Sequence, residues 1–160
     1  MNNIKYLVVF FVIISCSLNG SEDITKNYFD VIVEKSPWTL DHVEILEIKG
    51  VNGYVFNQSE IEKIAGALKN SNDGTIEFYD DGKGLWNSLL QCQNCPITWN
   101  EIPKEKRISW IYQDEASYFN IRTSNQVIEL IWNKSNDNFI IIRPDGTIRG
   151  DYLNCNYVWK

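Results

Sequence analysis

From residue 75 onward, apolar and polar side chains alternate in short segments that are separated by turn signals roughly every eight to twelve residues. Asp81-Gly82 and Asp145-Gly146 are dipeptides typical of tight hairpins. No helical stretch separates these segments, so parallel βαβ units are excluded. We predict an all-β fold of eight or nine antiparallel strands in a meander. A closed barrel is favoured over a sandwich because closure removes exposed sheet edges. The apolar positions recur at 76 and 78, 97 and 99, 108 to 112, 119 and 121, and 128 to 132.

One short helix is predicted before this meander. Ser59 and Glu62 have capping-box spacing, in which each side chain satisfies a backbone donor of the first turn. An apolar stripe of helical period follows, and the helix is expected to end near Asn70. Upstream, Trp38 to Ile48 predicts a strand, and Tyr28 to Val33 predicts either a helical turn or an edge strand.

The first residues have the features of an export signal. Lys5 supplies a positive charge, and the run from Tyr6 to Ile14 is entirely apolar. Nine helical residues rise about 13.5 Å, which is too short for a hydrocarbon core of about 30 Å. The segment is typical of the hydrophobic region of a signal peptide.

Ile13-Ile14-Ser15-Cys16 resembles the bacterial lipobox, although Ile14 stands where Ala or Ser is commoner. This resemblance implies cleavage before Cys16 and a diacylglycerol on its sulfur. It predicts a signal peptide at 1–15, a lipid attachment site and tether at 16–37, and a β domain at 38–160. The alternatives are an ordinary secretory signal and an uncut N-terminal anchor.

The net charge of the chain limits the classes of partner that it can bind. The formal net charge is −6, and no run of Lys or Arg interrupts it. An acidic domain repels phosphate backbones, so we expect no nucleic-acid partner. The expected location is the cell envelope, with the protein anchored in a membrane through its lipid, on the periplasmic face or the cell surface.

The order of strand motifs resembles the lipocalin-like domains of small bacterial lipoproteins. Trp38 opens the domain, a Phe-containing strand ends at Asp81-Gly82, and strands with a central Trp follow at Ile97-Thr98-Trp99 and Ile108-Ser109-Trp110. The capped helix near 59–69 departs from that pattern. The resemblance covers roughly residues 38–160, and it implies a lipocalin-like barrel whose interior holds a small apolar ligand.

Catalytic motifs are scarce. His42 has no neighbouring nucleophile motif, so we interpret it as a strand or surface residue rather than a general base. We predict no enzyme activity, no cofactor and no metal site; a zinc site built from His42 and the cysteines is the alternative.

Three cysteines remain after lipidation. We predict a structural disulfide between Cys92 and Cys95, in a loop between strands, as suits an oxidising compartment. Cys155 paired with either one is the alternative. A Cys-x-x-Cys pair at a helix N-terminus would instead indicate a thiol oxidoreductase.

Three tryptophans are candidates for lining a pocket: Trp99, Trp110 and Trp132 share the predicted inner face. An eight-stranded barrel has room either for packed side chains or for one small ligand. The sequence therefore predicts a non-catalytic, lipid-anchored binding protein for a small hydrophobic ligand. The alternative is a structural or protein-interaction lipoprotein with a solid barrel core.

Overall fold

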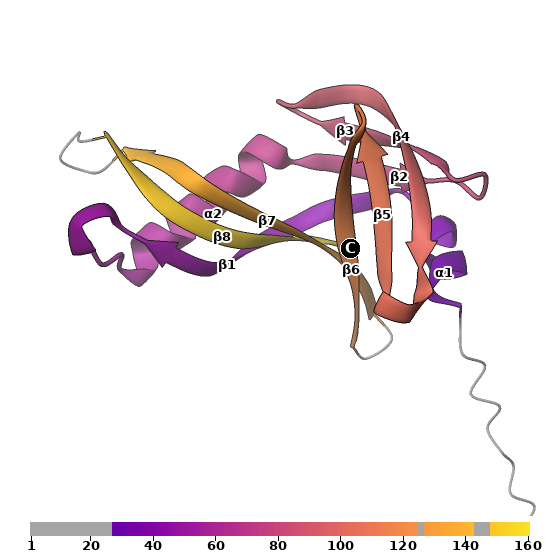
Figure 1. The fold of residues 1–160 in the computed structure, drawn as a ribbon, viewed down its shortest axis with the longest axis horizontal. Coiled ribbons are helices and arrows are strands. Elements are labelled where there is room, and N and C mark those ends of the chain that lie inside the picture. Colours follow the sequence, from indigo (N-terminus) through magenta and orange to yellow (C-terminus); the bar gives the residue numbers. More distant parts are fainter. Residues whose placement is uncertain (1–26, 125–126, 143–147) are drawn as a thin grey trace, which may run out of the picture.

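The protein folds as an eight-stranded antiparallel meander that closes into a barrel, as predicted. The computed structural model describes residues 27–124, 127–142 and 148–160. Each strand pairs with the next one, and the last strand pairs with the first. Figure 1 shows the arrangement. The strands are β1 (Trp38–Lys49), β2 (Gly74–Phe78), β3 (Lys83–Ser88), β4 (Cys92–Ile102), β5 (Arg107–Tyr112), β6 (Glu115–Ser124), β7 (Val127–Ile142) and β8 (Ile148–Trp159). The predicted signal peptide, Cys16 and the Asp145-Gly146 turn lie outside the described residues.

The alternation of the sequence sets the two faces of the barrel. Ile97 and Trp99 are buried while Thr98 between them is exposed, and Ile108 and Trp110 are buried on the neighbouring strand. Successive side chains of a strand point to opposite faces, so the apolar set fills the interior. The β2–β3 hairpin turns at Gly82, whose φ of 76° is a conformation that L side chains rarely adopt.

Three strands run far beyond the barrel and form an extension, which we call the arm. β1 pairs with β2 at only two positions, Trp38 with Ile76 and Thr39 with Thr75. Its pairing with β8 instead continues to Lys49. The arm consists of the outer parts of β1, β7 and β8, and it projects to the left in Figure 1. The apolar run at residues 139–142 forms the end of β7.

A short helix covers one end of the barrel, in the segment where the sequence allowed either a helical turn or an edge strand. α1 (Tyr28–Glu34) buries Phe29, Val31 and Ile32 in the main core. The Trp38 indole Nε1 donates to the Ile32 carbonyl at 2.8 Å, which holds the helix against β1. The described residues therefore contain two α-helices instead of one, and α1 lies inside the segment expected to be a tether.

The second helix, α2 (Gln58–Asn72), lies beside β1 along the arm and leads back to β2. Its cap differs from the prediction. The Asn57 side chain accepts from the Glu60 amide at 3.0 Å, and the Glu60 carboxylate accepts from the Asn57 amide at 2.9 Å. The capping box is thus built on Asn57 and Glu60 rather than on Ser59 and Glu62. Asn and Ser are equally good N-caps, so the pattern allowed both starts.

Candidate functional site

The end of the barrel opposite α1 is hollow. A cavity of about 580 Å³ lies between the β3–β4 turn, the β5–β6 turn and the start of the arm, and it opens to the surface. We call this cavity the cup. Its walls combine aromatic and polar groups. The aromatic residues of the cup are Trp86, Trp110, Tyr112 and Trp132. The uncharged polar residues are Gln91, Gln113, Ser117, Asn133 and Ser135. The charged residues are Glu115 and Lys134.

The aromatic residues form a fixed floor. The rings of Trp86 and Trp110 lie 5.0 Å apart at 83°, and those of Trp110 and Trp132 lie 5.5 Å apart at 84°. Tyr112 stands edge-to-face on Trp86 at 5.3 Å. Edge-to-face packing is the favoured geometry of aromatic pairs. Trp86 and Trp110 are buried, whereas Tyr112 and Trp132 are half-buried, so the last two present most of the aromatic surface to the cup.

Two indole groups in this floor lack ordinary partners. The Nε1 atoms of Trp86 and Trp110 are buried without a hydrogen bond to any part of the chain that the structure describes. Perpendicular neighbouring rings allow weak N–H to π contacts, which recover only part of a lost hydrogen bond. The floor of the cup therefore consists of aromatic surface, and two of its buried indole N–H groups make no ordinary hydrogen bond.

A disulfide borders the cup. Cys92 and Cys95 are bonded, which confirms the predicted pairing, and Cys155 is a free, buried thiol. The pair lies in the first residues of β4 rather than in a loop. The Tyr112 hydroxyl lies 3.4 Å from the Cys92 sulfur, so the bridge backs a wall of the cup. Burial raises the pKa of the Cys155 thiol, which keeps it protonated and unreactive.

The three tryptophans expected at a pocket separate in the structure. Trp110 and Trp132 line the cup, whereas Trp99 does not. The Trp99 indole donates to the carbonyl oxygens of Tyr79 and Lys83 at 2.9 and 3.0 Å, at the β2–β3 turn on the opposite side.

Sequence reasoning missed Trp86 and Tyr112 as cup residues. A signal for Trp86 existed, because a tight turn at Asp81-Gly82 places it opposite Ile76, a position already assigned to the inner face. Tyr112 shares the inner-face alternation of β5, but its position at the mouth depends on where the barrel ends.

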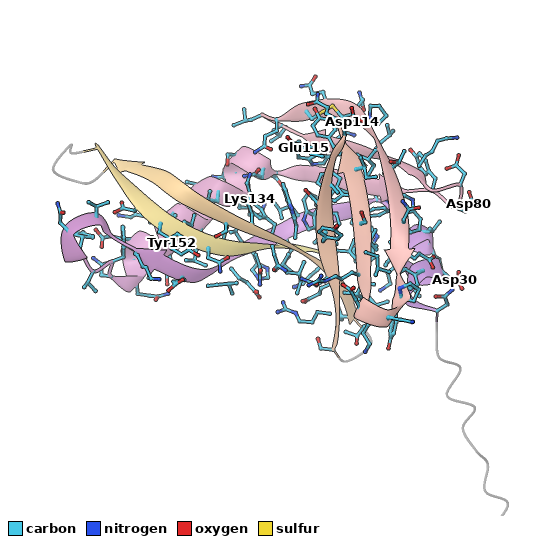
Figure 2. The ribbon with its side chains drawn as sticks, in the orientation of Figure 1. Asp30, Asp80, Asp114, Glu115, Lys134 and Tyr152 are labelled. Carbon is cyan, nitrogen blue, oxygen red and sulfur yellow. A yellow bond between two sulfur atoms is a disulfide. The ribbon has the colours of Figure 1, made fainter. Side chains whose placement is uncertain are left out.

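The mouth of the cup carries one charge of each sign. Glu115 begins β6, and Lys134 lies on β7 where the arm leaves the barrel (Figure 2). The Lys134 ammonium is 5.2 Å from the centre of the Trp132 ring, within the range of a cation–π contact. The two charges offset each other, so the cup has no net charge of its own.

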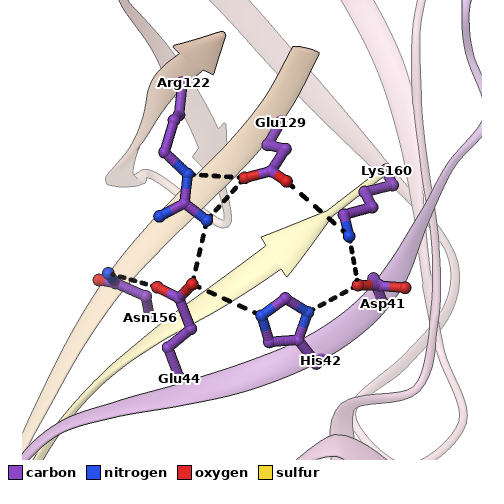
Figure 3. A network of polar contacts seen from close by, with 7 residues as sticks. All are labelled: Asp41, His42, Glu44, Arg122, Glu129, Asn156 and Lys160. Carbon is purple, nitrogen blue, oxygen red and sulfur yellow. Dashed lines mark hydrogen bonds and ion pairs between the residues drawn. The ribbon is translucent and has the colours of Figure 1, made fainter. Parts of the chain in front are cut away.

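A second polar cluster lies on the outer surface, where β1, β6, β7 and β8 are neighbours (Figure 3). Arg122 contacts Glu44 at 3.0 Å and Glu129 at 2.6 Å. His42, the only histidine of the chain, is within 2.6 Å of Asp41 and 3.5 Å of Glu44. His42 thus contacts carboxylates and no nucleophile in the described residues.

Ion pairing in this cluster stabilises the ionised acids. A hydrogen bond from Lys160 lowers the pKa of Asp41, and one from Arg122 lowers the pKa of Glu44. Lys160 also contacts Glu129 at 3.8 Å, which ties the last residue of the chain to β7. The cluster joins the four strands β1, β6, β7 and β8.

Within the described ranges, no group of three or more His, Cys, Asp or Glu side chains is placed to hold a metal ion. The helices among those residues are too short or too polar to cross a membrane. Comparison with known protein families, curated proteins and solved structures finds no match to this chain. The assignment of a function therefore rests on the sequence and the geometry alone.

Proposed function

We propose that this is an exported protein, anchored in the cell envelope through lipid on Cys16, whose barrel binds a small ligand without catalysing a reaction. The observation that carries the binding role is the cup. Its volume of about 580 Å³ falls within the roughly 300–1,000 Å³ of small-molecule sites. Its four aromatic residues supply apolar contact surface, and its polar groups can fix the orientation of a ligand.

The contrast with the opposite end supports this role. There α1 covers the barrel, and Phe78, Trp99 and Phe119 fill the interior as buried, mutually packed rings. A protein that needed only a solid core would gain from filling both ends, because packed interiors leave few voids larger than a water molecule.

Two features support export. The apolar segment before Cys16 is a signal-peptide pattern, and a disulfide is typical of proteins that fold outside the reducing cytosol. The cup lies at the end of the barrel away from α1, and the segment proposed as a tether precedes α1 in the sequence. A lipid at Cys16 would then leave the cup accessible.

The second candidate is a protein-interaction lipoprotein. Leu89 and Leu90 are 66% and 75% exposed beside the cup, on the turn between β3 and β4. Exposed apolar side chains that adjoin one another are a feature of protein-binding surfaces. In that case a partner would contact this turn, and the cup would bind no small molecule.

Binding is tested by titrating the full chain, purified in detergent, with N-phenyl-1-naphthylamine and following the fluorescence of the probe. We expect saturable binding that Trp132→Ala weakens at least tenfold. Tyr118→Ala is the matched control, because Tyr118 is an exposed aromatic residue on the outer face of β6. All chains are compared at one detergent concentration, so that partition into micelles cancels. Equal probe binding by wild type and both variants would eliminate the cup as the site.

Lipidation is tested separately in bacterial cells. Cys16→Ala should remove incorporation of radioactive palmitate and release the protein from the membrane fraction. Cys155→Ala is the control, since Cys155 is a buried thiol of the domain. Undiminished labelling of Cys16→Ala would disprove lipid attachment at this residue.

A further inference from the structure

We propose that the ligand of the cup is a neutral, hydroxyl-rich ring compound of the sugar class, which stacks one carbon face on Trp132 and Tyr112. This inference rests on the proposed binding function and specifies its ligand. It departs from the purely apolar ligand that the sequence suggested. Three properties of the walls lead to it: polarity, charge balance and the shape of the aromatic floor.

Polarity is the first property. Apart from the aromatic floor, most residues around the cup are uncharged and polar, among them Gln91, Gln113 and Ser117. A wholly apolar ligand would take these groups out of water without giving them partners. A buried polar group left in that state loses its hydrogen bonds to water without replacement, which weakens binding. A ligand that carries several hydroxyls can both donate to and accept from amides and hydroxyls.

Charge balance is the second property. Glu115 and Lys134 contribute one negative and one positive side chain to the cup. The Lys134 ammonium already lies over the Trp132 ring at 5.2 Å. An anionic ligand would meet Glu115, and a cationic ligand would meet Lys134. Both are disfavoured relative to a neutral molecule, because like charges repel each other.

The aromatic floor is the third property. Trp86 and Trp110 are 5% and 2% exposed and serve as support, while Tyr112 and Trp132 remain half-buried. The face of an aromatic ring carries negative potential, so it attracts the positively polarised C–H groups on one face of a saturated ring. Tyr112 adds a hydroxyl beside that stacking surface. A sugar ring has the required combination of one carbon face and a hydroxyl edge.

The shape of the site also limits which part of a glycan it takes. The cup opens to the surface between two hairpin turns and the arm instead of being enclosed. A ring bound on the floor can therefore continue outward through a glycosidic bond. We expect a terminal ring of an oligosaccharide to be the bound unit, with the rest of the chain leaving through the mouth.

The inference is tested by saturation-transfer NMR on the full chain in detergent with cellobiose, maltose and N,N′-diacetylchitobiose as probes. We expect at least one disaccharide to receive saturation, most strongly at the C–H protons of one ring face. Trp132→Ala should lower the affinity at least tenfold. Ser117→Ala, on the inner face of β6, should lower it severalfold, and Tyr118→Ala, on the outer face, should leave it unchanged. Lys134→Ala should not lower the affinity, because the Lys134 ammonium lies over the Trp132 ring on which the sugar would stack.

The outcomes separate the inference from the proposed function. If the naphthylamine probe binds in the cup and none of the disaccharides does, the sugar assignment is overturned while the binding role stands. If neither kind of probe binds, both fail. A loss of disaccharide binding in Lys134→Ala as large as that in Trp132→Ala would overturn the neutral-ligand argument. Circular dichroism of each variant shows whether the fold is retained.

Discussion

The two ends of the barrel are built from the same alternating strands, yet one is closed and the other is open. At the α1 end, the indole groups of Trp38 and Trp99 both donate to backbone carbonyls. At the cup end, the indole groups of Trp86 and Trp110 have no such partner among the described residues. The closed end is filled by packed rings, whereas the open end leaves aromatic surface exposed to the cup. An indole without a hydrogen-bond partner is not confined to the open end, because the buried Nε1 of Trp159, whose ring packs on Phe119, has none among the described residues. The two ends thus differ in packing, and the proposed ligand site lies at the end that is not filled.

The largest effect on the free energy of unfolding is expected when a buried side chain of the closed end is removed. Trp38→Ala removes a fully buried ring and the contact that holds α1, so we expect a loss of about 3–5 kcal/mol in the free energy of unfolding. Trp132→Ala, at the half-buried floor of the cup, should cost only about 1–2 kcal/mol. Urea denaturation followed by circular dichroism measures both. Equal losses would mean that Trp38 at the closed end and Trp132 at the cup contribute equally to the free energy of unfolding.

The next effect comes from the disulfide beside the cup. Replacing Cys92 and Cys95 together by Ser removes the cross-link of a loop that closes over a sequence separation of 3. Chain entropy predicts a loss of about 2 kcal/mol, since even a short loop restricts the unfolded chain. The same variant should bind the naphthylamine probe more weakly, because the bridge supports Tyr112. Cys155→Ser is the control for cysteine removal, and unchanged probe binding in the double variant would show that the bridge does not shape the cup.

A matched pair of substitutions isolates the indole hydrogen bonds. Trp99→Phe loses a donor with two carbonyl partners, whereas Trp110→Phe loses a donor with none in the described residues. Both shorten a buried ring by the same amount, so the difference reports the hydrogen bond. We expect Trp99→Phe to be more destabilising by about 1 kcal/mol, measured by thermal and urea unfolding. A larger loss in Trp110→Phe would reverse the comparison of the two ends.

The smallest effect concerns the ionic cluster on the outer surface. Pairing with Lys160 and with Arg122 lowers the pKa values of Asp41 and Glu44 from their ordinary 3.8 and 4.5. Because the folded pKa values are the lower ones, the unfolded chain binds more protons as the pH falls through this range. The stabilisation is therefore complete above about pH 5 and is lost on further acidification.

These carboxylates are partly exposed, so the total should stay below about 1 kcal/mol. Urea unfolding between pH 7 and pH 3 measures the effect, with the double variant Asp41→Asn and Glu44→Gln as the comparison. The variant should lose less stability on acidification than the wild type does. Parallel pH curves would show that the cluster contributes nothing to folding.

Some of this architecture was predictable from local pattern, and some was not. The period-two segments after residue 75 and the Asp81-Gly82 turn led correctly to an antiparallel meander, because side-chain alternation depends only on neighbouring residues. The N-terminus of α2 was placed wrongly because Asn57 and Ser59 both suit an N-cap. The helix at Tyr28–Glu34 has only 7 residues. A helix that short gains its stability from packing on the barrel, so local sequence left it undecided.

The sequence by itself determined which residues face inward, that the sheet is antiparallel, and that Cys92 and Cys95 lie close enough to bond. Only the tertiary structure decided that β1, β7 and β8 extend into an arm, that Trp99 belongs to the closed end, and that Trp86 and Tyr112 complete the cup. The physical reason is that alternation assigns a side chain to a face, a property of a few neighbouring residues. Its depth along the barrel depends on strand register, bulges and closure, which involve residues far apart in the chain.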